Sequence, residues 1–188
     1  MSNGPRGVQA LIVVDMQAAF VSGGQAVPAA GALLVSVTAL LRRARQEGAL
    51  VVQLQNDGPP DEPGTPGLGA VPPAAGARRG ARDPQGRRRR LPPDQPLGRP
   101  HGARRPAPGG VRGPSDMCVS VTARTALSLG YHVVLPHDAH AAYDIPAVPG
   151  LAGAVPHAMA SRAAEWSLGG QADVIARAAD IRFTPPGP

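Results

Sequence analysis

Cys118 is the only cysteine in the sequence, and its type suits nucleophilic chemistry. Without a second cysteine it cannot form an internal disulfide, so the thiol is either a small buried apolar group or a reactive one. It lies near the start of a predicted helix, where unpaired N–H groups and the helix dipole stabilise a nucleophilic thiolate. Asp15 is the second candidate, because it directly follows an apolar run. Taken alone, either residue could be structural, Asp15 as a helix cap or solvent-facing carboxylate and Cys118 as a buried helix residue.

Apolar patterns in the N-terminal part predict the elements that position Asp15. Residues 10–14 form a continuous apolar run rich in β-branched residues, which is typical of a strand buried on both faces. Residues 28–45 repeat apolar side chains at helical spacing, and Gly48 is a helix stop. A second strand is predicted over residues 49–54. A right-handed crossover would make the two strands parallel, so the class is α/β.

The C-terminal part repeats this alternation of helices and strands. The predicted elements are a helix over 117–129 that stops at Gly130, a strand over 132–135, a helix over 155–166 and a strand over 172–175. We predict one domain over residues 1–188, a doubly wound (Rossmann-like) parallel sheet with helices on both faces. In such sheets the binding crevice lies beyond the carboxyl ends of the strands. Asp15 and Cys118 would both face it.

The middle of the chain has a different composition from its ends. Residues 58–114 hold eleven arginines and four acidic residues, a net charge of +7, and fourteen of the 23 prolines. The remainder holds eight arginines and nine acidic residues, a net charge of −1. Such a stretch cannot bury enough apolar surface to offset the entropy lost on ordering it. We therefore expect residues 59–114 to be a disordered or aberrant segment that disrupts the centre of the sheet.

This distribution of charge bears on the partners of the protein. The formal net charge of +6 suggests a nucleic-acid partner, but all of it lies in the middle segment, where a solvated charge run such as residues 87–90 explains it. We expect no specific nucleic-acid partner. The sequence has no apolar run of membrane-spanning length, and residues 10–14 are too short for a signal peptide. The expected location is cytoplasmic, with no membrane partner.

Three segments together resemble the isochorismatase-like cysteine hydrolase family, to which the nicotinamidases are related. Residues 10–20 contain an apolar strand, then Asp-Met-Gln, then a phenylalanine; residues 115–124 place Cys-Val and Thr-Ala on a helix; residues 131–140 resemble the next strand with its Asp-Ala turn. The resemblance covers roughly residues 8–58 and 115–183. Residues 68–113 do not match.

The resemblance implies a role for each matched residue. Asp15 would take the thiol proton as general base, and Cys118 would attack an amide-type carbonyl of a small-molecule substrate to give an acyl intermediate that water hydrolyses. Gln17 and Phe20 would bind the substrate. The resemblance implies no cofactor, and it implies that the chain can form a homo-oligomer.

Two departures from the family predict impaired turnover. The family's third catalytic residue is a lysine, but all 19 basic residues here are arginines, whose bulkier planar guanidinium does not replace a compact ammonium. The oxyanion region, which the resemblance assigns to Pro114 and Cys118, is also altered. The family uses a backbone N–H four residues before the cysteine, and Pro114 has none to donate.

We predict no metal site. Some nicotinamidases carry an Asp/His/His site after the second strand, but residues 55–59 contain no histidine. His132, His137 and His140 lie close in sequence, yet they alternate around a predicted strand and turn and are not expected to converge with a fourth ligand.

A non-catalytic function is the alternative interpretation of the sequence. The chain would then be a catalytically dead α/β scaffold whose Arg-rich segment binds polyanions non-specifically. Salt-sensitive retention on DNA with an unreactive thiol would favour it.

Residues 68–113 also prompt a hypothesis about the gene. GC-rich codons read off-register yield mainly Arg, Pro, Gly and Ala, the composition seen here, so we hypothesise that two compensating one-base errors bracket this stretch. Sequencing the codons for residues 60–120 is expected to reveal both errors. An independently confirmed, uninterrupted reading frame would refute the hypothesis.

Overall fold

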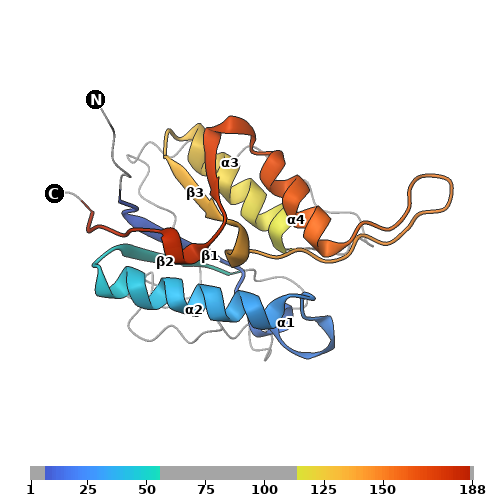
Figure 1. Ribbon diagram of the computed structural model, residues 1–188, viewed down its shortest axis with the longest axis horizontal. Coiled ribbons are helices and arrows are strands. Elements are labelled where there is room, and N and C mark those ends of the chain that lie inside the picture. The colour runs from blue at the N-terminus through green and yellow to red at the C-terminus, as the bar shows by residue number, and fades with distance from the viewer. Residues whose placement is uncertain (1–6, 56–113, 187–188) are drawn as a thin grey trace, which may run out of the picture. The chain divides into compact units, whose positions relative to one another are not determined.

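The computed structural model describes residues 7–55 and 114–186 (Figure 1). Within these ranges, strands and helices alternate along the chain. Their bounds are β1 Ala10–Val14, α1 Ala18–Val21, α2 Ala30–Gln46, β2 Leu50–Leu54, a π-helical turn η3 Pro114–Val119, α3 Ser120–Ser128, β3 Val133–Pro136, α4 His157–Trp166 and β4 Ala172–Ile175. Short 3-10 turns include η4 His137–Ala139 and η6 Ala178–Asp180. No helix among the described residues is long and apolar enough to cross a membrane.

The strands form parallel pairs, as the crossover argument predicts. β1 pairs with β2, with Ala10 opposite Leu50 and Val14 opposite Leu54. β3 pairs with β4 in the same parallel sense. Among the described residues these are two separate two-stranded sheets. The predicted disruption of the sheet centre and the predicted character of residues 59–113 lie outside the described residues.

Helix α2 buries one face against the N-terminal pair. Its buried residues recur every three or four positions, which places them on a single stripe: Leu33, Val37, Leu40, Leu41 and Ala44. The helix packs against both β1 and β2. Figure 1 shows α2 on one side of the strands and α3 and α4 on the other. This arrangement agrees with the predicted doubly wound class.

Burial along β1 differs from the prediction. Leu11 and Val13 belong to the core clusters that contain α2, whereas Ile12, which alternates to the opposite face, is 44% exposed. A continuous apolar run predicts burial on both faces. In the structure only the face that meets α2 is well covered by the elements described.

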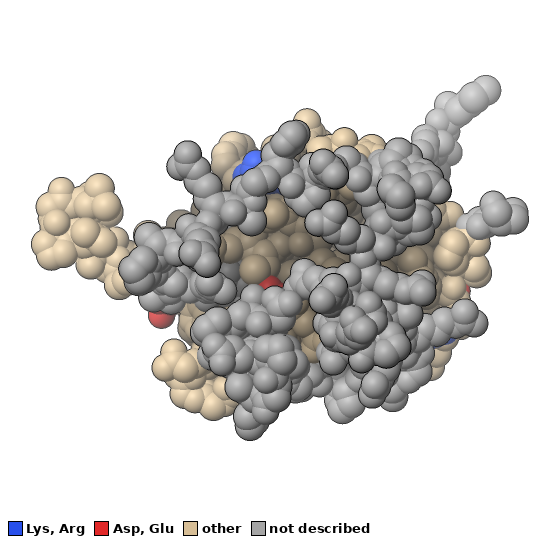
Figure 2. Space-filling model, turned by 180° about the vertical axis from the view of Figure 1, so that it is seen from behind, with Lys and Arg blue, Asp and Glu red and all other residues tan. Residues whose placement is uncertain are grey.

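Figure 2 shows that uncharged side chains dominate the described surface seen from behind.

The predicted elements are present, with shifted ends. The strands over residues 10–14 and 172–175 have the predicted bounds. The helix predicted over 117–129 begins earlier, as the π-helical turn η3, and continues as α3. The helix predicted from residue 155 begins at His157, because residues 145–155 form an extended arm with an antiparallel bridge between Ile145 and Val155.

Shortening a buried side chain of α2 should destabilise the fold. Leu41 is 1% exposed, so Leu41→Ala is expected to lower the free energy of unfolding by about 2–5 kcal/mol through lost burial and the resulting cavity. Val35, on the same helix but 72% exposed, is the control, and Val35→Ala should change stability by about 0.5 kcal/mol or less. Urea denaturation followed by circular dichroism measures both. Equal losses would contradict the assigned packing of α2.

Candidate active site and the buried His–Glu cluster

Asp15 lies at the carboxyl end of β1 in an unusual backbone conformation. Its φ of 49° is the only positive φ of a non-glycine residue within residues 7–55 and 114–186. The residue is buried, and its N–H donates to the carbonyl of Leu54 in β2 at 3.0 Å. Such a conformation costs of order 1–3 kcal/mol and is concentrated at functional sites. Asp15 is therefore neither solvent-facing nor a helix cap, and the paired strands hold it in place.

Cys118 lies in the π-helical turn η3 and is partly exposed. Turns of this kind inside helices occur frequently at functional sites. The turn contacts β1 and also α4. The helical turn that carries the cysteine thus lies against the strand that ends at Asp15. Pro114, predicted for the oxyanion region, is the first residue of this same turn.

Gln17 and Phe20, the predicted substrate-binding residues, are both buried in the segment that follows Asp15. Gln17 has no exposed surface. Phe20 belongs to a core cluster that also contains Met16 and Ala141. This packing fixes the segment after β1, although it does not test the substrate contacts predicted for these two side chains.

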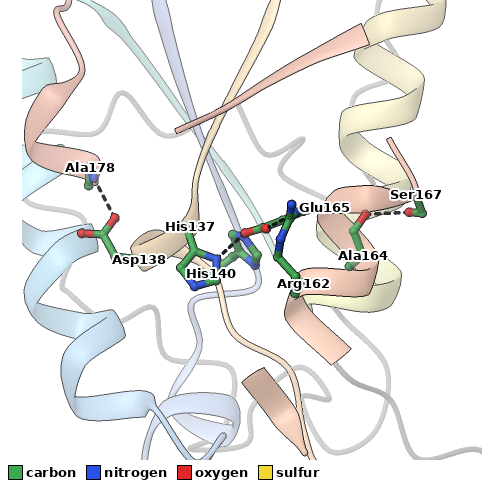
Figure 3. Close-up of polar contacts among 8 residues, drawn as sticks. All are labelled: His137, Asp138, His140, Arg162, Ala164, Glu165, Ser167 and Ala178. Carbon is green, nitrogen blue, oxygen red and sulfur yellow. Dashed lines mark hydrogen bonds and ion pairs between the residues drawn. The ribbon is translucent and has the colours of Figure 1, made fainter. Parts of the chain in front are cut away.

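Two of the three histidines considered in the sequence converge on a buried glutamate. His137 lies in η4, directly after β3, and its Nδ1 is 2.5 Å from Oε1 of Glu165 on α4. Nε2 of His140 is 3.0 Å from the same oxygen (Figure 3). His132 points elsewhere and pairs with exposed Asp173 at 2.8 Å. The three histidines thus do not all converge, but two of them do, because a 3-10 turn brings side chains three residues apart to the same side.

One feature of the sequence indicates this cluster, although the prediction did not use it. Glu165 lies on the buried stripe of α4, four residues after buried Ser161. A glutamate is almost never fully buried unless it is paired. An acidic residue on the apolar face of a predicted helix therefore predicts basic partners from another element.

Burial and neighbouring groups shift the pKa values of His140 and Glu165. Burial lowers the pKa of His140, and this outweighs the opposing effect of the Glu165 carboxylate. Burial by itself would raise the pKa of Glu165, but the hydrogen bond and charge of His137 prevail and lower it. Near neutral pH, Glu165 is thus ionised and His140 is neutral. Nδ1 of His140 is buried and has no hydrogen-bond partner within the described parts of the chain.

Another histidine–carboxylate contact, between His157 and Asp144, fixes the start of α4. The Asp144 carboxylate accepts a hydrogen bond from the backbone N–H of His157 at 2.6 Å. That bond, together with the contact to the His157 ring, lowers the pKa of Asp144. An anion placed on the first N–H groups of a helix is a favourable arrangement.

The His–Glu cluster connects the two parts of the candidate active site. The residue after His140, Ala141, packs in the core cluster of Phe20. The hydroxyl of Tyr143 donates to the carbonyl of Gln25. On the other side, the helix that carries Glu165 contacts η3. The cluster therefore ties the loop beside the Asp15 segment to the helix beside the cysteine turn.

Comparison with known proteins decides the family. Two streptothricin hydrolases from Streptomyces noursei are 50% and 51% identical to this chain, over 190 and 191 residues, and each match covers 95% of the chain. The chain belongs to the isochorismatase-like cysteine hydrolase family. It spans 66% of the length of the first relative and 72% of the second. No protein-family model matches the chain.

Solved structures of isochorismatase-like proteins have the same fold. An isochorismatase from Pseudomonas putida superposes with a TM-score of 0.61 at 18% identity, covering 96% of this chain and 94% of that one. An isochorismatase hydrolase from Oleispira antarctica gives 0.63 at 22% identity, covering 95% and 98%. The resemblance and the α/β class predicted from sequence are both confirmed. At these identities the structural likeness supports the fold alone.

The buried Glu165 should matter more to stability than exposed carboxylates. Glu165→Ala leaves the buried His140 ring without its acceptor, and we expect a loss of about 1–3 kcal/mol in the free energy of unfolding. Asp173→Ala removes an exposed carboxylate that also pairs with a histidine, and should cost less than about 1 kcal/mol. Urea denaturation of the two variants tests this ranking. Comparable losses would show that the His–Glu cluster does not stabilise the fold.

Proposed function

We propose that this chain hydrolyses an amide or related C–N bond of a small molecule, with Cys118 as nucleophile and Asp15 as general base. One observation carries the proposal: the π-helical turn that holds the lone cysteine contacts the strand whose end holds a buried, left-handed aspartate. Membership of a hydrolase family supports the reaction class.

The proposed reaction uses these two side chains and water. Asp15 takes the thiol proton, and the thiolate of Cys118 attacks the carbonyl carbon. Collapse of the tetrahedral intermediate breaks the C–N bond, and the amine leaves with a proton. Water then attacks the thioester, which releases the acid and restores the thiol. The strained backbone of Asp15 supports this role because it fixes the carboxylate before the substrate arrives.

Streptothricin is the first substrate to test. Both Streptomyces noursei relatives are named streptothricin hydrolase, and they are half identical to this chain. We propose that turnover by this chain is slower than theirs. The sequence contains no lysine, and Pro114 has no N–H for an oxyanion. Loss of one such donor costs about 10²–10³-fold in rate in other enzymes.

Alkylation of Cys118 tests the proposed base. Because the chain has one cysteine, iodoacetamide incorporation measured by mass spectrometry reports on that thiol alone. We expect rapid labelling already near pH ~6, whereas an unactivated thiol reacts only as the pH approaches about 8.5. Asp15→Asn should move the profile to higher pH, and the matched change at exposed Asp180 should leave it unchanged. Identical profiles for Asp15→Asn and the parent chain would rule out the general base.

Turnover tests the substrate and the nucleophile. With streptothricin in excess, we expect slow hydrolysis detectable by liquid chromatography and mass spectrometry, below the rate of a Streptomyces noursei enzyme assayed in parallel. Cys118→Ala should reduce it to background, and Asp15→Asn should lower kcat by about 10²-fold or more. Circular dichroism of each variant confirms the fold. Undiminished hydrolysis by Cys118→Ala would exclude the proposed nucleophile.

A further inference from the structure

We infer that His137, His140 and Glu165 form a binding site for a divalent transition-metal ion of the Zn²⁺ type. One ligand atom from each residue lies within 4.8 Å of the other two. The ring nitrogens Nδ1 of His137 and Nε2 of His140 both point at the same carboxylate oxygen, Oε1 of Glu165 (Figure 3). These three atoms are the proposed ligands. The site is independent of the proposed hydrolysis at Cys118.

The donor set selects the class of ion. Two imidazole nitrogens suit Zn²⁺ and its first-row neighbours, whereas Mg²⁺ and Ca²⁺ prefer an all-oxygen shell. Two histidines and one glutamate make three protein ligands, which leaves a fourth tetrahedral position for water or another small ligand. A site with this composition binds an ion with an exchangeable position.

Movements of at most about 1.5 Å bring the three atoms to coordination distance, since no two of them are more than 4.8 Å apart. Zn²⁺ binds nitrogen and carboxylate oxygen at about 2.0–2.2 Å, so neighbouring ligand atoms in a tetrahedron are roughly 3.3 Å apart. The distances from Oε1 to the two ring nitrogens are 2.5 and 3.0 Å. Each has to open by less than about 1 Å, and the ion replaces the protons that bridge these atoms.

The surroundings of the cluster hold two of the ligands in place. The side chains of Glu165 and His140 are 1% and 2% exposed, so packing restricts both. Nη1 of Arg162 donates to the other carboxylate oxygen, Oε2, at 3.0 Å. An outer partner of this kind orients a ligating carboxylate and leaves Oε1 directed at the ion. His137, whose side chain is 50% exposed, gives the ion a path from solvent.

The proposed site differs in position from the Asp/His/His site that some nicotinamidases carry after the second strand. Here the ligands come from the turn after β3 and from α4. An ion bound there joins those two elements directly. Because it binds the folded state, it should also raise the melting temperature of the protein.

Isothermal titration calorimetry with Zn²⁺ tests the site on the full chain after treatment with a chelator. The Cys118→Ala background is used throughout, so that the thiol cannot supply a ligand. We expect saturable binding that weakens by at least about 10-fold in His137→Ala. His132→Ala is the matched control, because it removes an exposed histidine that lies directly before β3, which begins at Val133, and outside the cluster. Its affinity should equal that of the parent.

Absorption by bound Co²⁺ provides a second readout, which is independent of the heat of binding that calorimetry measures. Visible absorption bands of tetrahedral Co²⁺ are expected in the parent and in His132→Ala, and should be lost in His137→Ala and Glu165→Gln. His137 is half-exposed, so its variant keeps the test valid even where Glu165→Gln fails to fold. Absence of saturable Zn²⁺ binding to the parent, or equal affinity in His137→Ala, would overturn the inference.

Discussion

Packing of α2 is the interaction on which both the fold and the candidate active site depend. Its buried stripe covers β1 and β2, and these strands hold Asp15 at their carboxyl edge. The same helix contacts η4, after β3, and η6, after β4. Arg43 donates to backbone carbonyls of Ala179, at 2.9 Å, and of Ile181. Helix α2 therefore holds the carboxyl ends of both parallel pairs in position.

The second constraint on the structure is that the buried carboxylate of Glu165 needs charged or hydrogen-bonding partners. A buried carboxylate is tolerated only when charged or polar partners surround it. Arg162 contacts one oxygen, and His137 and His140 contact the other. Because these partners come from different segments, satisfying one carboxylate also fixes the loop after β3 against α4. That loop continues into the core around Phe20.

Local patterns in the sequence predicted most of the elements but not the contacts between them. Residues 10–14 and 172–175 were predicted with the observed bounds, and in the first of them the apolar run ends sharply at Asp15, where the strand ends. The π-helical turn before Ser120 was missed because the hydrogen-bond register of a turn leaves no mark in apolar periodicity. The meeting of His140 with Glu165 depends on how distant elements pack, which spacing along the chain does not encode. That Asp15 and Cys118 face one crevice stays a prediction from strand topology, because carboxyl ends of parallel strands share an edge.

The contact between α2 and the C-terminal segment has a consequence for how the protein is made. Leu40 and Ala44 are buried by Ile181 and Phe183, and Glu47 accepts the N–H of Phe183 at 2.9 Å. During synthesis, the strand–helix–strand unit leaves the ribosome long before these partners are translated. One side of α2 is then uncovered and able to associate with other nascent chains. Completion of the native core has to wait for the last few residues of the described chain, which makes chaperone protection most valuable during that interval.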